Sequence, residues 1–301
     1  MPLKPILFDF FYGSKTLFTE LLNSGQFEKG EVDIRRFPDG ESYVRVRSQC
    51  TQRQVIILAN LHHPDDKFLP LLFLCQALKD LNVKHITLIS PYLPYMRQDK
   101  RFHDGECITS AQFSSILSSA IDRIVTIDPH LHRYASLSEI YNVDNLVLKA
   151  DNTIAEWIKQ NVNKPLIIGP DSESEQWAAA TAELINCPYL VLTKERLGDR
   201  DVKISTPHAG DLTDHTPVLV DDIISTGRTM IETAKVLNAE GFGSPVCIGV
   251  HAVFSERDYN ALRNSAVEKI ITCNTIPHHS NGIDVAKLLL GSVAAVINPS
   301  S

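Results

Sequence analysis

The stretch VLVDDIISTGRTM, residues 218–230, decides the fold. Its apolar start predicts a strand that ends in two carboxylates, and a short turn then leads into a helix that begins near Arg228 or Thr229. Free backbone N–H groups at a helix start bind phosphate, and glycine lets the backbone approach it closely. Carboxylates beside this cradle can accept hydrogen bonds from vicinal hydroxyls, so the stretch predicts a site for a ribose 5-phosphate moiety. The expected members of the site are Asp221, Asp222, Ser225, Thr226, Gly227, Arg228 and Thr229.

A simpler interpretation treats the same residues as structural. Asp222 would end a strand, and Ser225 and Thr226 would only cap the helix, which is a common arrangement. The complete string of strand, paired carboxylates, hydroxyls, glycine and helix is much rarer than either fragment, so we favour the functional interpretation. The chain has no G-x-x-x-x-G-K-[ST] string and no G-x-G-x-x-G after a strand, so P-loop and Rossmann sites have no support.

Short apolar runs alternate with longer helical patterns over most of the chain. Such continuous apolar strands with helices between them predict an α/β fold with parallel sheets covered on both faces. Strands are expected at residues 6–8, 43–46, 55–59, 85–89, 124–127, 166–168, 189–192, 218–220, 246–250 and 270–272. Helices are expected near residues 14–24, 66–80, 109–119, 151–160, 173–185, 228–239, 256–263 and 284–290.

The length of 301 residues predicts two domains, at roughly 150 residues each. Residues 55–90 and 165–195 share one order of strand, polar loop, amphipathic helix and strand, which suggests two similar halves. An Asp/Asn cap opens a helix at Asp151, so we expect an N-terminal domain over 1–147 and a C-terminal domain over 148–301.

Composition excludes several classes of protein. Lys plus Arg is 29 and Asp plus Glu is 36, so the net charge of −7 argues against nucleic acid or an anionic membrane as partner. The longest apolar run, residues 68–78, is too short to span a bilayer, and the first residues do not resemble a secretory signal. Six scattered cysteines without a C-x-x-C pair favour reduced thiols in the cytoplasm.

Five further motifs stand in order around the first. They are RRFPDGESYVRV (35–46), SPYLPYMRQDKRF (90–102), TIDPHLH (126–132), IIGPDSESEQW (167–177) and TKERLGDRDVKI (193–204). Together with D-D-x-x-S-T-G they resemble the ribose-phosphate pyrophosphokinase family, the synthetases of phosphoribosyl pyrophosphate (PRPP), from Arg36 to about Val293. The resemblance implies two domains of the type I phosphoribosyltransferase fold, with the final helix, about 284–301, packed on the N-terminal domain. It also implies Mg²⁺ as cofactor, ATP and ribose 5-phosphate as substrates, PRPP and AMP as products, and a homo-oligomer, a dimer or higher.

The resemblance assigns roles residue by residue. The strand-to-helix stretch would hold ribose 5-phosphate, and the ATP site would be shared between subunits. The residues implied for ATP are Phe37, Asp39, Glu41, Arg97, Gln98 and Asp99. The catalytic residues implied are Lys194, Arg196 and His130, with Lys194 and Arg196 on a loop that closes over the transferred group. The metal residues implied are His130, Asp171 and Asp128.

The chain departs from the family at three places. Two extra carboxylates, Glu173 and Glu175, follow Asp171, the loop after Arg196 is poor in lysine, and the phosphate turn reads S-T-G-R-T. With KRFHDGE after residue 99, these features look closer to the archaeal-type synthetases. Two alternatives stay open: a phosphoribosyltransferase that uses PRPP, which leaves R-F-P-D-G-E unexplained, and a non-catalytic regulatory relative, which the acidic stretch keeps open.

Two pairs of adjacent histidines fall outside these motifs. His62 with His63 and His278 with His279 have no further ligand within reach along the sequence. We therefore expect both pairs to lie in surface loops without a metal.

Overall fold

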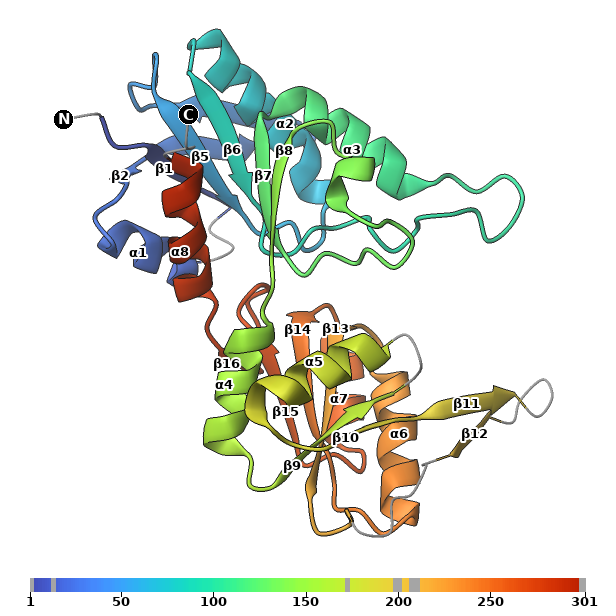
Figure 1. Cartoon of the computed structure of the whole chain (residues 1–301). Coiled ribbons are helices and arrows are strands. Elements are labelled where there is room, and N and C mark those ends of the chain that lie inside the picture. The colour runs from blue at the N-terminus through green and yellow to red at the C-terminus, as the bar shows by residue number, and fades with distance from the viewer. Residues whose placement is uncertain (1–2, 12–14, 171–173, 197–201, 206–211, 298–301) are drawn as a thin grey trace. The chain divides into compact units, whose positions relative to one another are not determined.

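The alternating apolar runs fold into two parallel sheets, each in its own compact unit. The computed structural model describes residues 3–11, 15–170, 174–196, 202–205 and 212–297. Unit 1 comprises Met1–Leu148, Thr275–Pro277 and Val285–Ser301, and unit 2 comprises Lys149–Asn274 and His278–Asp284. Figure 1 shows both units as a sheet flanked by helices, as expected for this α/β pattern.

Unit 1 holds a six-stranded sheet in the order β2-β1-β5-β6-β7-β8, with every neighbouring pair parallel. The strands are β1 (Ile6–Phe10), β2 (Glu28–Lys29), β5 (Gln54–Ala59), β6 (His85–Ile89), β7 (Arg123–Ile127) and β8 (Asp144–Leu148). The helices are α1 (Lys15–Asn23), α2 (Asp65–Asp80), α3 (Thr109–Ala120), the 3₁₀ turn η1 (Leu137–Glu139) and α8 (Ala286–Ile297). α2 contacts α3, and α8 contacts α1 and β8, so the last helix of the chain belongs to unit 1.

Unit 2 repeats this layout in the order β10-β9-β13-β14-β15-β16, again parallel throughout. The strands are β9 (Pro165–Gly169), β10 (Tyr189–Val191), β13 (Thr216–Ile224), β14 (Val246–Ala252), β15 (Lys269–Cys273) and β16 (Asn281–Ile283). The helices are α4 (Asp151–Asn161), α5 (Glu175–Ile185), α6 (Arg228–Ala239) and α7 (Glu256–Arg263). Because strand orders and chain directions match position by position, the two units are built on one plan.

The shared plan includes a hairpin at the same topological place in each unit. In unit 1, β3 (Val32–Arg36) pairs antiparallel with β4 (Ser42–Val46), and along the chain this hairpin follows the edge strand β2 and precedes the inner strand β5. In unit 2, β11 (Thr193–Arg196) pairs antiparallel with β12 (Val202–Ser205), and along the chain this hairpin follows β10 and precedes β13. The motifs at 35–46 and 193–204 therefore lie in hairpins that are inserted at equivalent places in the two units.

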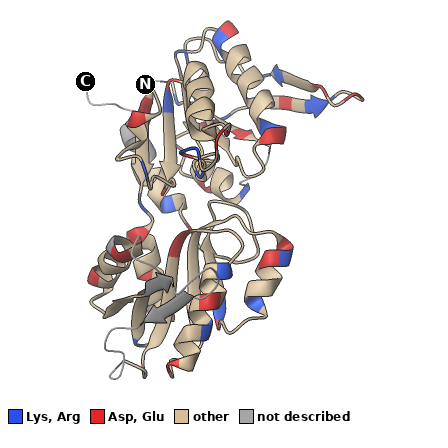
Figure 2. Cartoon of the chain, turned by 90° about the vertical axis from the view of Figure 1, so that its right-hand side faces the viewer, with Lys and Arg blue, Asp and Glu red and all other residues tan. Residues whose placement is uncertain are grey.

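The cores follow from the continuous apolar strands. Ile57 and Leu88 are fully buried in unit 1, and Leu219 and Ile248 are fully buried in unit 2, as strands covered on both faces require. Charges are spread over the ribbon, and Figure 2 shows acidic and basic segments interspersed. Within the described part of the chain, no helix is long and apolar enough to cross a membrane.

Candidate functional site

The phosphate turn of unit 2 follows β13. This strand continues through Asp221 and Asp222 to Ile224, so the expectation that it ends at the carboxylates is wrong. The reason lies in its neighbour, because β14 runs on to Ala252 and pairs Asp221 with Gly249 and Ile224 with Ala252. Both carboxylates are only partly buried. Adjacent strand residues project to opposite faces, so the two carboxylates are not equivalent.

Gly227 makes the turn from strand to helix. Its φ of +67° lies in the left-handed region, and a Cβ placed there would meet Cβ and Cδ2 of the buried Leu262 at 3.3 Å each. Both the backbone conformation and the close approach of α7 therefore require glycine.

Gly227 stands at the N-cap position of α6, and because glycine has no side chain, this residue makes no side-chain cap. Oγ1 of Thr226 accepts a long hydrogen bond of 3.5 Å from the backbone N–H of Arg228. The interpretation of Ser225 and Thr226 as simple helix caps is thus supported by one long contact, that of Thr226. The first N–H groups of the helix keep their capacity to bind an anion.

A cavity of about 520 Å³ adjoins the phosphate turn between α6 and α7. Thr226 and Arg228 line it from the α6 side. From the α7 side it is lined by Arg257 and by Asp258, whose backbone N–H and carboxylate both hydrogen-bond to the Ser255 hydroxyl. Arg257 was not among the residues expected from sequence, because nothing in its local pattern distinguishes it from a solvated helix residue.

The R-F-P-D-G-E motif forms the tip of the β3–β4 hairpin. The Phe37 ring is 40% exposed, and the guanidinium of Arg35 lies over it at 4.8 Å and over Tyr43 at 4.2 Å. Asp39 Oδ1 accepts a hydrogen bond of 3.1 Å from the backbone N–H of Glu41, so this carboxylate also shapes the turn. The hairpin thus presents an ordered, exposed aromatic ring, which is suited to stack on a planar base.

The Y-M-R-Q-D segment lies in the loop between β6 and α3. Arg97 is exposed, whereas the Asp99 side chain is only 5% exposed and accepts a 3.1 Å bond from Arg133 Nε. Gln98 contributes its backbone carbonyl to the N–H of Ser110 at the start of α3. Of the three residues of this segment expected at ATP, Arg97 is an exposed cation, Gln98 fixes the loop through its backbone carbonyl, and Asp99 is one partner of an ion pair. Arg133 follows the T-I-D-P-H-L-H motif by one position and was not expected from its residue type.

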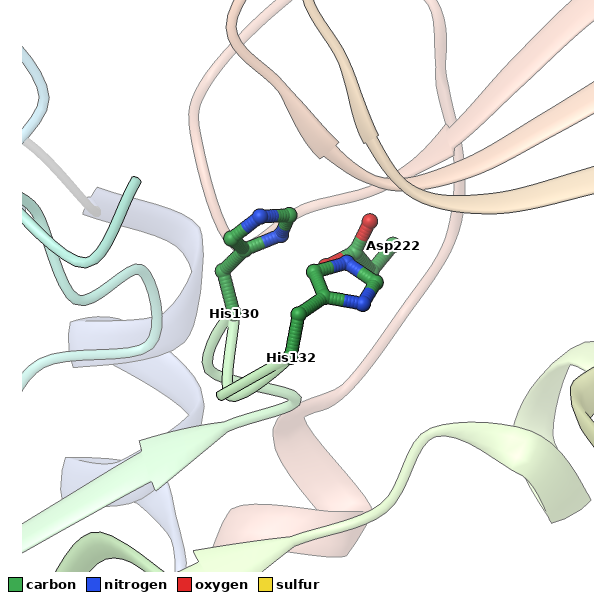
Figure 3. A group of neighbouring side chains, drawn as sticks. All are labelled: His130, His132 and Asp222. Carbon is green, nitrogen blue, oxygen red and sulfur yellow. The ribbon is translucent and has the colours of Figure 1, made fainter. Parts of the chain in front are cut away.

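The D-P-H-L-H loop follows β7. Asp128 is buried at 2% exposure with φ +37°, which is costly for a residue other than glycine, and its N–H donates to Leu148 O at 3.0 Å. The rings of His130 and His132 stack edge to face with centroids 4.0 Å apart. Figure 3 draws these two histidines on their loop and Asp222 on its own strand. The loop thus carries a partly buried imidazole, His130, two positions after a buried carboxylate, Asp128.

Two of the remaining expected residues lie on the β11–β12 hairpin. Lys194 and Arg196 stand on β11, opposite Ile204 and Val202 of β12. Asp171, together with Glu173, lies outside the described residues, whereas Glu175 is exposed in the first turn of α5. The hairpin therefore carries both expected catalytic cations.

Comparisons with known proteins agree with this architecture. The family model for the N-terminal domain of ribose phosphate pyrophosphokinase matches residues 11–120, and that for the phosphoribosyl transferase domain matches residues 136–287. A crystal structure of phosphoribosylpyrophosphate synthetase from Mycobacterium smegmatis superposes with a TM-score of 0.86 at 23% identity, covering 99% of this chain and 100% of that one, which shows the fold.

Curated relatives extend the match to sequence. The chain is 33% identical to ribose-phosphate pyrophosphokinase of Sulfurisphaera tokodaii, over 85% of this chain and 88% of that protein. It is 30% identical to ribose-phosphate pyrophosphokinase of Pyrococcus abyssi, over 95% of this chain and 97% of that protein. Both relatives are archaeal, in line with the features noted at the phosphate turn. The chain belongs to the ribose-phosphate pyrophosphokinase family.

Proposed function

We propose that the chain is a ribose-phosphate diphosphokinase, which transfers the β,γ-diphosphoryl group of ATP to the C1 hydroxyl of ribose 5-phosphate. PRPP and AMP are the products. One observation carries the proposal within this family: the uncapped start of α6, reached through Gly227, at the carboxyl end of a central parallel strand. Ligands of open α/β sheets bind at that edge.

The reaction forms one bond and breaks another at the β-phosphorus of ATP. The C1 oxygen of the sugar attacks this phosphorus, and the bond from it to the oxygen bridging the α-phosphorus breaks, so AMP leaves with the electron pair. The C1 hydroxyl loses its proton in the process. Catalysis then rests on holding the two reactants in line and on neutralising charge around the phosphorus. We assign that neutralisation to Lys194 and Arg196 on β11.

The sugar phosphate is assigned to the phosphate turn. The N–H groups that begin α6, with the hydroxyls of Ser225, Thr226 and Thr229, would bind the 5-phosphate, and the exposed Arg228 would add a positive charge. Asp221 and Asp222 would accept hydrogen bonds from the ribose diol. Because they occupy opposite faces of β13, we expect their contributions to differ.

ATP is assigned to unit 1. The exposed Phe37 ring, ordered by Arg35 and Tyr43, would stack on the adenine, and Glu41 and Asp39 would lie at its edge. Arg97 is exposed for a phosphate contact, whereas Asp99 would act through Arg133. By analogy with the family, the hairpin would serve a neighbouring subunit in a homo-oligomer.

Mg²⁺ is the cofactor that this family implies. The D-P-H-L-H loop fits such an ion, because it carries the carboxylate of Asp128, the kind of oxygen ligand that Mg²⁺ prefers, and the imidazole of His130. Asp171 would be a further ligand. When bound with ATP, the ion would neutralise phosphate oxygens. The six cysteines are free thiols, and we place the enzyme in the cytoplasm.

The test is a direct assay of the purified chain with ATP, Mg²⁺ and ribose 5-phosphate, scored by chromatography for AMP and PRPP. We expect both products in equal amounts, and no AMP above background when free ribose replaces the phosphorylated sugar. A chain that makes no AMP would leave the non-catalytic alternative. A chain that makes no AMP but consumes PRPP with a nucleobase would be a phosphoribosyltransferase.

Paired variants test the diol assignment. Asp221→Asn and Asp222→Asn keep the size of each side chain and remove its charge. We expect at least one of them to raise KM for ribose 5-phosphate about tenfold, as loss of a charge-assisted hydrogen bond implies, with KM for ATP unchanged. Unchanged sugar kinetics in both variants would remove the carboxylates from the sugar site.

A further inference from the structure

Two adjacent residues of the loop that follows β7, Arg133 and Tyr134, bond to the neighbouring loop between β6 and α3. Arg133 Nε donates a hydrogen bond of 3.1 Å to Asp99 Oδ1. The Tyr134 hydroxyl lies 3.0 Å from Oγ of Ser110, the second residue of α3. The two contacts therefore bracket the stretch 100–109, with one contact before its first residue and one after its last.

Both contacts reach groups that are removed from solvent. The Asp99 side chain is 5% exposed, although the Arg133 side chain that bonds to it is 48% exposed. Ser110 is fully buried, and its backbone N–H also donates to the carbonyl of Gln98 at 3.3 Å. A buried carboxylate whose cation is removed keeps its desolvation penalty, so it must move toward water. Loss of Arg133 is therefore expected to displace the loop as well as to break an ion pair.

The segment that carries Arg97 is strained next to these contacts. Tyr95 has φ +62°, in the left-handed region that bulky residues rarely adopt. Its ring packs on Phe113 of α3 with centroids 4.8 Å apart, and its hydroxyl bonds to the Asp65 carboxylate of α2. Such strain persists only where the surroundings fix it, and it concentrates at functional sites. The exposed Arg97 therefore lies between two anchored positions, Tyr95 before it and Asp99 after it.

The interior of the 100–109 stretch is shaped by Glu106. Its Oε2 accepts a bond of 2.7 Å from the Phe102 N–H and one of 3.4 Å from Gln98 Nε2. Its backbone carbonyl accepts a bond of 3.0 Å from Arg101 Nε. These contacts join residues of one loop to each other. Attachment to the loop that follows β7 is made by Arg133 and Tyr134.

We propose that Arg133 and Tyr134 are positioning residues for ATP, which fix both ends of the 100–109 stretch and so hold Arg97 in place for the triphosphate. Both act through the loop and not by contact with the nucleotide. The inference rests on the proposed function, because that function assigns ATP to the loop between β6 and α3. His130 precedes Arg133 by three positions, so the contact also ties the segment assigned to ATP to the loop of a proposed catalytic residue. A misplacement of about 1 Å caused by a remote residue can cost about 10²-fold in rate.

Calorimetric titration of the full chain with ATP and millimolar Mg²⁺, without the sugar, tests these roles. We expect Arg133→Gln to raise the Kd for ATP about tenfold or more, because it removes the charged partner of a buried carboxylate. Tyr134→Phe keeps the ring and removes one neutral hydrogen bond, so it should raise the Kd about two- to tenfold. In steady-state assays the KM for ATP should rise likewise. The KM for ribose 5-phosphate should stay unchanged, because that substrate is assigned to unit 2.

A second substitution separates positioning from direct contact. In the Arg133→Gln chain, Asp99→Asn removes the buried charge that has lost its partner. The double variant should therefore bind ATP more tightly than Arg133→Gln alone, since replacing both partners of a buried pair costs less than removing one. If Arg133 itself bonded to the nucleotide, Asp99→Asn would restore nothing.

Arg123→Gln is the matched control. Arg123 is the first residue of β7 and pairs with Asp144 at 2.9 Å, so this ion pair lies at the opposite end of the strand from Arg133. Its side chain is 15% exposed. The variant should lower the unfolding midpoint and leave the Kd for ATP unchanged.

Trypsin provides a readout that needs no ligand, because it cleaves after Arg97, Lys100 and Arg101, which flank Asp99. Cleavage requires local opening of the loop. Arg133→Gln should therefore be cut at these positions several-fold faster than the wild type, whereas Arg123→Gln should be cut there at the wild-type rate.

Three results would overturn the proposal. They are ATP binding in Arg133→Gln as tight as in the wild type, equal weakening of ATP binding in Arg123→Gln, and a double variant that binds no more tightly than Arg133→Gln. A wild-type chain that binds no ATP would refute both this role and the proposed function. A chain that shows all the expected differences in ATP binding but forms no AMP would refute the proposed function alone, so the two failures are distinguishable.

Discussion

Gly227 is the residue on which the phosphate turn depends, and Gly227→Ala tests that dependence. With φ at +67°, an alanine there would cost about 1–2 kcal/mol in backbone strain. Its Cβ would also stand 3.3 Å from two carbons of Leu262, a fully buried residue of α7. Crowding of this kind in a packed core costs about 1–3 kcal/mol. We therefore expect unit 2 to lose about 2–5 kcal/mol of stability.

Two other glycines separate these contributions. Gly241 has φ +87°, and a Cβ added there would meet nothing within 4 Å, so Gly241→Ala should cost only the backbone strain of about 1–2 kcal/mol. Gly243 has no positive φ and the same open space, so Gly243→Ala should be neutral or stabilise by about 0.4–1 kcal/mol through the unfolded chain.

The assay is thermal or urea unfolding followed by tryptophan fluorescence, which reports unit 2 because Trp157 and Trp177 both lie there. For a unit of this size each kcal/mol of destabilisation lowers the unfolding midpoint by roughly 3–5 °C, so the midpoint of Gly227→Ala should lie roughly 6–25 °C below that of the wild type. Its KM for ribose 5-phosphate should also rise, since Leu262 and the start of α6 must move apart. If Gly227→Ala is no less stable than Gly241→Ala, the packing argument at Leu262 is refuted.

Three further predictions concern catalysis, ATP and pH. Lys194→Ala should lower kcat about 10²-fold or more and leave KM little changed, because it removes one transition-state donor. A kcat near the wild-type value in steady-state assays would remove Lys194 from the catalytic residues. Phe37→Ala should raise KM for ATP about tenfold, because aromatic–base stacking contributes about 1–3 kcal/mol. Phe37→Tyr keeps the ring, so its KM for ATP should stay near the wild-type value. Equal KM values in the wild type and both variants would contradict the stacking assignment. Burial raises the pKa of Asp9 from 3.8 to about 6, against a smaller opposing effect of Lys29. The folded state therefore binds the Asp9 proton more tightly than the unfolded chain does. The stability that this proton contributes is fully present below pH 3.8, and it is lost as the pH rises to about 6. Asp9→Asn should remove that dependence and stabilise unit 1 at pH 7.5 by about 2 kcal/mol, measured by urea unfolding with circular dichroism; an unchanged pH profile would count against it.

The local sequence predicted most of the regular structure. Continuous apolar runs gave the inner strands such as β5 and β14, because a strand buried on both faces needs no alternation. Edge elements were missed, among them β2 and β16, because they are two or three residues long and carry polar side chains. The hairpin strand β3 was also missed, since VDIRR is half exposed and lacks an apolar run.

The candidate site divides in the same way. The turn at Gly227 and the start of α6 were predictable, because a positive φ and a helix start have local signatures in residue type. The continuation of β13 to Ile224 was not, because the length of a strand depends on the partner beside it. The ion pair of Asp99 with Arg133 was equally invisible, since it joins the loops that follow two different strands.

By itself the sequence determined the class of fold, the family and the turn from strand to helix at Gly227, all of which depend on short-range patterns of residue type. Only the tertiary structure decided that both units share one strand order and that the β3–β4 and β11–β12 hairpins are equivalent insertions. These facts depend on which strands pair and on where a helix packs. Such choices are made by burial and register over long separations in sequence, and no local window of residues contains them.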